Sequence, residues 1–137
     1  MQIEFSVDQG RAISALQVNQ NVFLTGRAGT GKSFLINQYI KSYPDKKKLS
    51  VVASTAASAM LIQGATFHSF FGLGLAKGSP EDVINAALDN KNTVRRLKKV
   101  ETVIIDEISM ISGRLLDIAF RLVSRIRGNH LPWGGIK

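Results

Sequence analysis

Apolar residues along this chain alternate between short continuous runs and longer stretches with helical spacing. The short apolar runs predict three buried strands, at residues 21–25, 49–53 and 102–105. Apolar positions three or four residues apart predict helices at about 7–19, 33–42, 56–61, 80–88, 93–99 and 113–127. Strands that alternate with helices in this way predict an α/β fold, in which helices flank a parallel sheet as a three-layer domain.

Local start signals agree with several of these helices. Ser6 and Gln9 have the spacing of a capping box, and Ser79 precedes a proline and two acidic residues, as at a helix N-terminus. Residues 43–48 form a charged turn, and residues 65–71 form a compact segment that ends in a Gly-Leu-Gly loop.

The sequence GRAGTGKS at residues 26–33 matches the phosphate-binding loop pattern G-x-x-x-x-G-K-S. Its glycines let successive backbone N–H groups point toward one anion, and the following helix N-terminus favours phosphate. Lys32 supplies a positive charge for the β- and γ-phosphates, and the Ser33 hydroxyl is suited to Mg²⁺. We therefore predict that this chain binds a nucleoside triphosphate through Gly26, Ala28, Gly29, Thr30, Gly31, Lys32 and Ser33.

Composition narrows the class of protein. A length of 137 residues with 45% hydrophobic residues predicts one globular domain. The chain has no cysteine and no recognisable signal peptide, which favours a reducing cytoplasmic location, and no apolar run approaches membrane-spanning length. A formal net charge of +8 favours a polyanionic partner such as nucleic acid.

Two adjacent acids, Asp106 and Glu107, follow the apolar run at 102–105. In an open parallel sheet, ligands gather at the carboxyl ends of the strands. An aspartate there can hold Mg²⁺, and the neighbouring glutamate can activate a water molecule for transfer of the γ-phosphoryl group. With the phosphate-binding loop upstream, the pair predicts nucleotide hydrolysis.

Taken together, these segments resemble the petite-integration-frequency DNA helicases, which are close to RecD and Dda within superfamily 1. The resemblance extends from about Val7 to the last residue. Ala56 stands where Gly is usual, Ala65 falls within a G-G-x-T stretch, and Trp133 replaces Phe. The segments that carry it are Asp8-Gln9, GRAGTGKS (26–33), ASTAASA (53–59), GATFHSF (64–70), VIIDEISM (103–110) and LPWGGI (131–136).

The resemblance implies an ATP-dependent 5′-to-3′ DNA helicase that acts in DNA repair, recombination or genome maintenance. Residues 1–137 would be its N-terminal RecA-like motor domain, C-terminally truncated before a second RecA-like domain that supplies the arginine finger. The implied cofactors are ATP and Mg²⁺, and the implied partner is single-stranded DNA.

The resemblance also implies roles for individual residues. Gln9 would read the adenine edge, Ser33 and Asp106 would hold Mg²⁺, and Lys32 and Glu107 would be catalytic. The DNA path would be lined by Thr55, Ala56, Thr66, His68, Ser69 and Phe70. Hydroxyls and an imidazole can hydrogen-bond backbone phosphates, and an aromatic ring can stack on a base.

Each of these residues also has a simpler structural interpretation. Gln9 and Thr55 can serve as helix caps, and Phe70 can belong to the core. The basic stretch at residues 91–99 and the arginines at 114, 121 and 125 fit solvated helix faces, and His130 has no metal-binding partner at a recognisable spacing. Two rival functions remain: a non-motor P-loop ATPase, and a nucleotide- and DNA-binding module without turnover.

Overall fold

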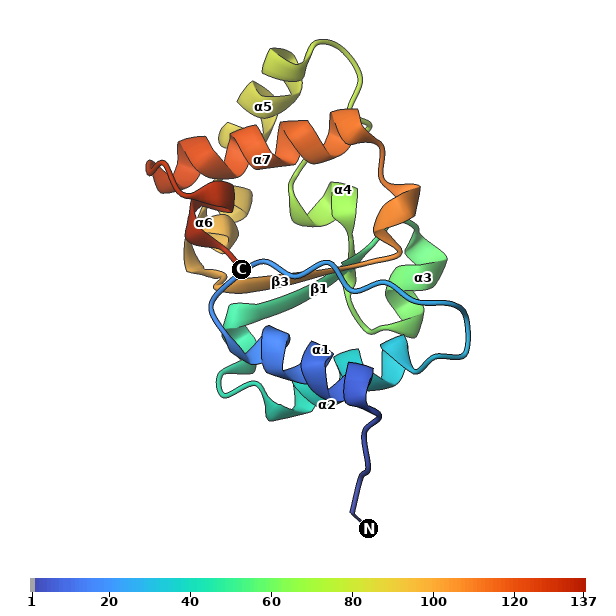
Figure 1. Ribbon diagram of the computed structural model, residues 1–137. Helices are drawn as coiled ribbons and strands as arrows, with labels where there is room; N and C mark the ends of the chain where they lie inside the picture. The colour runs from blue at the N-terminus through green and yellow to red at the C-terminus, as the bar shows by residue number, and fades with distance from the viewer. Residues whose placement is uncertain (1) are drawn as a thin grey trace. The chain divides into compact units, whose positions relative to one another are not determined.

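The computed structural model describes residues 2–137, and the backbone divides into two compact units (Figure 1). The first unit runs to Lys46 and includes Lys137, and the second comprises residues 47–136. All three strands belong to the second unit, whereas the glycine-rich loop belongs to the first.

The first unit is built on two helices, α1 (Val7–Gln17) and α2 (Lys32–Ser42), which pack against each other. The predicted capping box forms at the start of α1. The Ser6 hydroxyl accepts a hydrogen bond from the Gln9 amide at 3.2 Å, and the Gln9 side chain accepts one from the Ser6 amide at 2.9 Å. The buried side chains of the helix pair are Leu16, Leu35 and Tyr39.

The predicted strand at residues 21–25 does not form. Within residues 2–137 this segment pairs with no strand, and its backbone is neither helical nor part of a sheet. Val22 and Leu24 are half-buried while Phe23 is exposed, so the alternation typical of an extended segment is present. A strand also requires a ladder of backbone hydrogen bonds to a neighbour, and apolar alternation does not supply that neighbour.

The second unit contains a parallel sheet in the order β2–β1–β3. The central strand is β1 (Leu49–Ala53), which lies between β2 (Ala65–Thr66) and β3 (Thr102–Asp106). Two of the three predicted strands are therefore confirmed, and the α/β fold with a parallel sheet is confirmed with them. The third strand of the sheet, β2, arises instead from the compact segment after residue 64.

Apart from a single-turn helix at residues 67–70, within the predicted compact segment, the helices of the second unit follow the predicted positions closely. They are α3 (Ala56–Leu61), α4 (Phe67–Phe70), α5 (Pro80–Leu88), α6 (Lys91–Lys99) and α7 (Gly113–Arg127). Short 3₁₀ turns are η1 (Lys46–Lys48), η2 (Ile108–Met110) and η3 (Pro132–Gly135). α6 begins two residues earlier than predicted because the Asn90 side chain caps it, accepting hydrogen bonds from the amides of Asn92 and Thr93.

The core of the second unit lies between the sheet and the helices on one side of it. In Figure 1, α4, α6 and α7 lie on one side of β1 and β3, and α5 packs beyond α7. The largest fully buried apolar side chains are Phe67, Phe71, Ile84, Leu97, Ile118 and Leu122. Among residues 2–137, no helix combines the length and the apolar character needed to cross a membrane.

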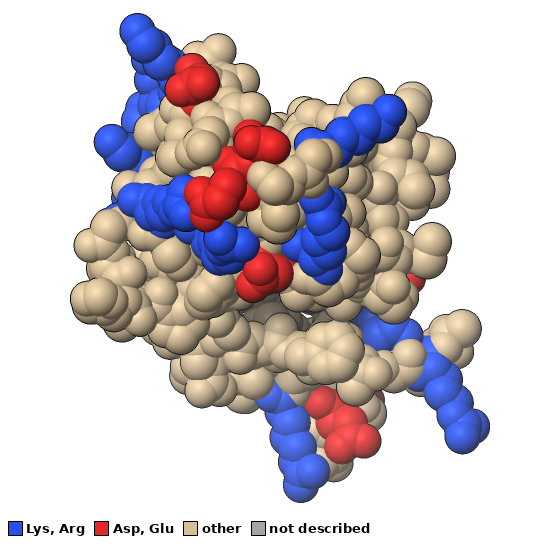
Figure 2. All heavy atoms as spheres, turned by 90° about the horizontal axis from the view of Figure 1, so that it is seen from above, with Lys and Arg blue, Asp and Glu red and all other residues tan. Residues whose placement is uncertain are grey.

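The arginines at 114, 121 and 125 are exposed or half-exposed on α7, as the solvated-face interpretation expects, and each is also bound to a neighbouring group. Arg114 donates to the carbonyls of Ala76 and Gly78 at 3.0 and 2.7 Å. Arg121 and Arg125 both bind Glu81 of α5, at 2.7 and 2.6 Å. Figure 2, viewed from above α5 and α7, shows acidic and basic side chains side by side on this face. The arginines therefore fasten α7 to the elements that cover it.

We predict that Glu81→Gln lowers the melting temperature by on the order of a few degrees at neutral pH, because the α5–α7 ion pairs are lost. The hydrogen bond from Arg125, together with the positive charges of Arg125 and Arg121, lowers the pKa of Glu81 in the folded protein. This contribution is therefore present above the pKa of the unfolded chain and is lost as pH falls through the folded-state pKa. Thermal melts across this range should show the wild type and the variant converging at acid pH.

Asp117→Asn is the matched control for this prediction. Asp117 also contacts Arg121, but at 3.8 Å and from within the same helix, so its loss should change the melting temperature less. An equal effect of the two substitutions would show that the α5–α7 contact is not what stabilises this face.

Candidate functional site

The glycine-rich loop runs directly into the first turn of α2. Gly29 and Gly31 have φ angles of 79° and 90°, in the left-handed region that glycine adopts readily. Gly31 is the N-cap of α2, and no side chain caps this helix end. The first backbone N–H groups of α2 are therefore available to a ligand, and the helix dipole favours an anion there.

The side chains of the loop close it on itself. The Lys32 ammonium donates to the carbonyl of Gly26 and, at 3.0 Å, to that of Arg27. The Thr30 hydroxyl donates to the same Arg27 carbonyl at 2.7 Å. Lys32 is half-buried, whereas Ala28 is exposed. These bonds hold the lysine side chain against the loop carbonyls.

Gln9 is attached to this loop as well as to its own helix. While its side-chain oxygen completes the capping box, its Nε2 donates to the carbonyl of Thr30 at 3.2 Å. The capping interpretation of Gln9 is therefore confirmed, and its role in reading adenine stays a prediction. The same amide lies so close to Gly31 that a Cβ on this glycine would come within 2.9 Å of Nε2.

We predict that Gly31→Ala destabilises the protein by roughly 1–3 kcal/mol, because alanine would have to adopt the left-handed region and approach the Gln9 amide. Gly10→Ala is the matched control, since Gly10 lies inside α1 with no atom within 4 Å of a Cβ added there. Alanine at that position should stabilise by about 0.5–1 kcal/mol. Chemical denaturation of both variants measures the difference, and opposite signs are expected.

The carboxyl ends of the three strands lie at one edge of the sheet. The register pairs Ala53 with Thr66 on one side and with Asp106 on the other. Asp106 and Thr66 end their strands at this edge, and the segments that begin there contain Glu107 and the other sequence-predicted DNA contacts. The sheet therefore gathers them at the edge where parallel sheets bind ligands.

Asp106 and Glu107 differ in backbone and exposure although they are adjacent. Asp106 is the last residue of β3 and is half-buried, whereas Glu107 is exposed. Glu107 has φ 54° and ψ 48°, a left-handed conformation that costs a non-glycine residue about 1–2 kcal/mol. Such strain at a residue with a predicted catalytic role is typical of functional sites.

Thr55 and Ala56 form the start of α3. The Thr55 hydroxyl accepts from the Ser58 amide at 3.1 Å and donates to the Ser58 hydroxyl at 3.0 Å. This confirms the N-cap interpretation of Thr55. Both residues are exposed, so the cap leaves their surface accessible.

The T-F-H-S-F segment folds as the end of β2 and the single-turn helix α4. Thr66 caps α4, accepting from the Ser69 amide at 3.1 Å. Ser69 is exposed and His68 is half-buried, so both reach the surface. Phe70 is only 4% exposed, and its ring packs edge-on against Phe71 in the core. The core interpretation of Phe70 is therefore confirmed. Its contact with DNA stays a prediction that the burial of the ring disfavours, because base stacking needs an exposed ring face.

Sequence reasoning missed Arg96, which it grouped with the other cations of residues 91–99. Arg96 is half-buried and donates to the carbonyls of Phe70 and Ser69 at the end of α4. The helical phase carried the signal for this. Thr93 and Val100 are buried, and Arg96 lies on their face of the helix, three residues after the first and four before the second.

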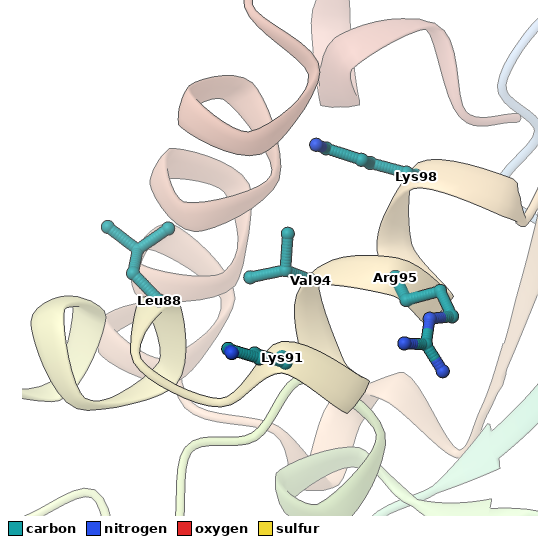
Figure 3. A pocket seen from close by; sticks show the side chains of 5 residues that line it. All are labelled: Leu88, Lys91, Val94, Arg95 and Lys98. Carbon is teal, nitrogen blue, oxygen red and sulfur yellow. The ribbon is translucent and has the colours of Figure 1, made fainter.

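The other basic residues of α6 are exposed. Lys91, Arg95 and Lys98 are exposed, and with Leu88 and Val94 they line an open groove of about 370 Å³ (Figure 3). The exposure of these three residues fits the predicted solvated helix face, whereas Arg96 of the same basic stretch is half-buried.

Comparison with known proteins identifies the family. The family model described as PIF1-like helicase matches residues 6–137. This chain belongs to the PIF1-like helicase family. The resemblance inferred from the sequence segments is thereby confirmed, and the phosphate-binding loop, the acids after β3 and α4 all lie within the matched region.

Individual relatives in the PIF1-like family cover the same region. ATP-dependent DNA helicase Pif1 of Bdellovibrio bacteriovorus is 50% identical over 136 residues, which are 99% of this chain and 31% of that protein. The crystal structure of Pif1 helicase from Candida albicans has 40% identity and a TM-score of 0.89, covering 98% of this chain and 31% of the other. Pif1 helicase from Bacteroides in complex with ADP-AlF3 and single-stranded DNA has 31% identity and a TM-score of 0.81, over 99% of this chain and 31% of the other.

This chain therefore spans less than a third of the length of these PIF1-like relatives. Within residues 2–137, no group of three or more histidine, cysteine, aspartate or glutamate side chains is arranged to hold a metal ion.

Proposed function

We propose that this chain is the ATP-binding first motor domain of an ATP-dependent DNA helicase that moves 5′-to-3′ along single-stranded DNA. The observation that carries the proposal is the loop from Gly26 to Ser33, whose left-handed glycines lead into the uncapped N-terminus of α2. Membership of the PIF1-like family supports the motor function. The direction of movement rests on the sequence resemblance.

In this proposal the loop amides from Gly29 to Ser33 cradle the phosphates, and Lys32 leaves the loop carbonyls to pair with the β- and γ-phosphates. Gln9 would exchange its bond to the Thr30 carbonyl for the adenine edge. Both side chains already donate hydrogen bonds to the loop, so binding replaces one set of acceptors by another.

Ser33 and Asp106 supply a hydroxyl and a carboxylate oxygen, which are the ligand types that Mg²⁺ prefers. We assign both residues to the ion that accompanies ATP, where it would neutralise charge on the phosphate oxygens. Glu107 would accept the proton of the attacking water as that water bonds to the γ-phosphorus, and ADP would leave in line. The exposed side chain of Glu107 supports this role.

For DNA, we propose that the strand passes over the segments after β1 and β2, and contacts Thr55, Ala56, Thr66, His68 and Ser69. The exposure of Ser69 and the half-exposure of His68 support contact with backbone phosphates. We do not assign base stacking to Phe70, since its ring is buried.

Single-strand binding by variants tests the DNA path. His68→Ala combined with Ser69→Ala should weaken binding of single-stranded DNA more than Lys98→Ala combined with Lys99→Ala, because only the first pair lies on α4. Binding should also weaken as salt rises, through release of counterions. Fluorescence anisotropy with a labelled oligonucleotide measures both effects, and the opposite ranking would assign the DNA to the basic face of α6 instead.

A further inference from the structure

We propose that Arg96 is a positioning residue for single-stranded DNA: its guanidinium fixes the C-terminal end of α4 and thereby the orientation of His68 and Ser69. The inference rests on the proposed function, because it assumes that α4 contacts DNA. Neither the family relatives' names nor the sequence motifs assign a role to Arg96.

The contacts of Arg96 converge on the last turn of α4. Its Nε donates to the carbonyl of Phe70 at 3.0 Å, and its Nη2 donates to the carbonyl of Ser69 at 3.2 Å. The guanidinium carbon also lies 5.4 Å from the centre of the Phe70 ring. A planar, charged fork therefore binds two adjacent backbone carbonyls and lies over the aromatic ring of one of the same residues.

The helix needs such a partner because it is very short. α4 has four residues, and a single helical turn is not stable in isolation. The Ser69 carbonyl already accepts a hydrogen bond from the Gly72 amide at 3.2 Å. Arg96 adds a charged donor to this carbonyl and to that of Phe70, and a cation at a helix C-terminus is stabilising. Thr66 closes the other end through the Ser69 amide. His68 and Ser69 are therefore held between a cap on one side and Arg96 on the other.

The chain after α4 is seated on the same face of α6. Gly72 has φ +67°, and a Cβ there would come within 2.6 Å of the Thr93 hydroxyl. Arg96 Nη2 reaches that hydroxyl at 3.4 Å. Thr93 and Arg96 thus form one surface against which the end of α4 and the following turn are fixed, so a change at Arg96 is transmitted directly to the DNA-facing residues.

The experiment compares Arg96→Ala and Arg96→Lys with Arg95→Ala, in the chain of residues 1–137 binding a labelled single-stranded oligonucleotide. Arg95 is the matched control because it is the adjacent residue with the same charge, but it is exposed and lines the outward groove (Figure 3). We expect both Arg96 variants to lose on the order of 10-fold in affinity, since lysine keeps the charge without the fork. ATP affinity should stay unchanged in both.

The salt dependence separates positioning from contact. Each phosphate contact contributes a slope of about −0.7 to the plot of log K against log salt for single strands. A positioning role leaves this slope unchanged in Arg96→Ala while the affinity falls. A slope that becomes shallower by about 0.7, or an Arg96→Lys variant that binds like the wild type, would overturn the proposal because the charge alone would then explain the effect.

A double-mutant cycle separates this inference from the proposed function. If Arg96 acts through α4, Arg96→Lys should add little loss once His68 and Ser69 are both alanine. Full additivity would overturn the inference. If the substitutions of His68 and Ser69 leave DNA affinity unchanged, the proposed DNA path is wrong. If those substitutions weaken DNA binding but the Arg96 variants bind like the wild type, only the positioning role of Arg96 is wrong.

Discussion

Lys32→Ala is expected to weaken ATP binding by on the order of 100-fold or more, because the substitution removes two or more charge-assisted hydrogen bonds to phosphate. The Lys32 ammonium lies over the loop, bound to the carbonyls of Gly26 and Arg27. A phosphate in the loop would offer this ammonium stronger acceptors than those carbonyls. Isothermal titration calorimetry with ATP measures the loss.

Arg27→Ala is the matched control within the same loop. Arg27 is exposed, and it occupies one of the positions of the loop pattern that any residue can fill. Its removal should leave the ATP affinity within a few-fold of the wild type. This result would show that losing any positive charge from the loop does not explain the weaker binding of Lys32→Ala. Unchanged affinity in Lys32→Ala would show that the loop does not bind the phosphates.

The chain of residues 1–137, taken alone, is expected to bind ATP but to hydrolyse it roughly 10³–10⁵-fold more slowly than a motor with an arginine finger. Charge that develops on the γ-phosphoryl oxygens requires a cation beyond Lys32 and Mg²⁺. The family resemblance implies that an arginine of a second domain supplies that cation. Several arginines of the described chain are already bound to protein groups, namely Arg96, Arg114, Arg121, Arg125 and Arg127.

Single-turnover hydrolysis with and without single-stranded DNA checks this expectation, with Glu107→Gln as the control for the proposed base. We also expect no unwinding of duplex DNA, because one domain has no partner against which to open and close. Rapid hydrolysis that DNA stimulates and Glu107→Gln abolishes would show that residues 1–137 contain all the groups needed for chemistry. Complete absence of turnover, with ATP bound, would favour the rival view of a binding module.

The local signals in the sequence were sufficient for most of the elements. The caps Ser6 and Ser79 predicted the starts of α1 and α5, and the apolar spacing predicted the course of α7. Helix caps and helical periodicity act over a few residues, so a short segment contains the whole signal. The loop at 26–33 was equally predictable, since its glycines and lysine are required by the backbone geometry of phosphate binding itself. Both kinds of signal are complete within one short segment.

Pairing between distant segments was not predictable in the same way. The apolar run at 21–25 and the run at 49–53 look alike, yet only the second is a strand, because only it has neighbours in register. Conversely, Ala65 and Thr66 form β2 although two residues carry almost no periodic signal. Strand formation depends on a hydrogen-bonded partner, and the partner is chosen by the tertiary structure.

By itself, the sequence determined the α/β class, the position of the glycine-rich loop before a helix and the family, because each depends on residue types at fixed local spacing. The tertiary structure decided how the cations are used. Arg96 and Arg95 are neighbours with the same charge, but one fastens α4 and the other faces an open groove. Phe70 is likewise a core residue. The contacts of a long or aromatic side chain depend on the groups that surround it in the folded protein. Because residues distant in the sequence supply those groups, local sequence patterns do not determine the role of the side chain.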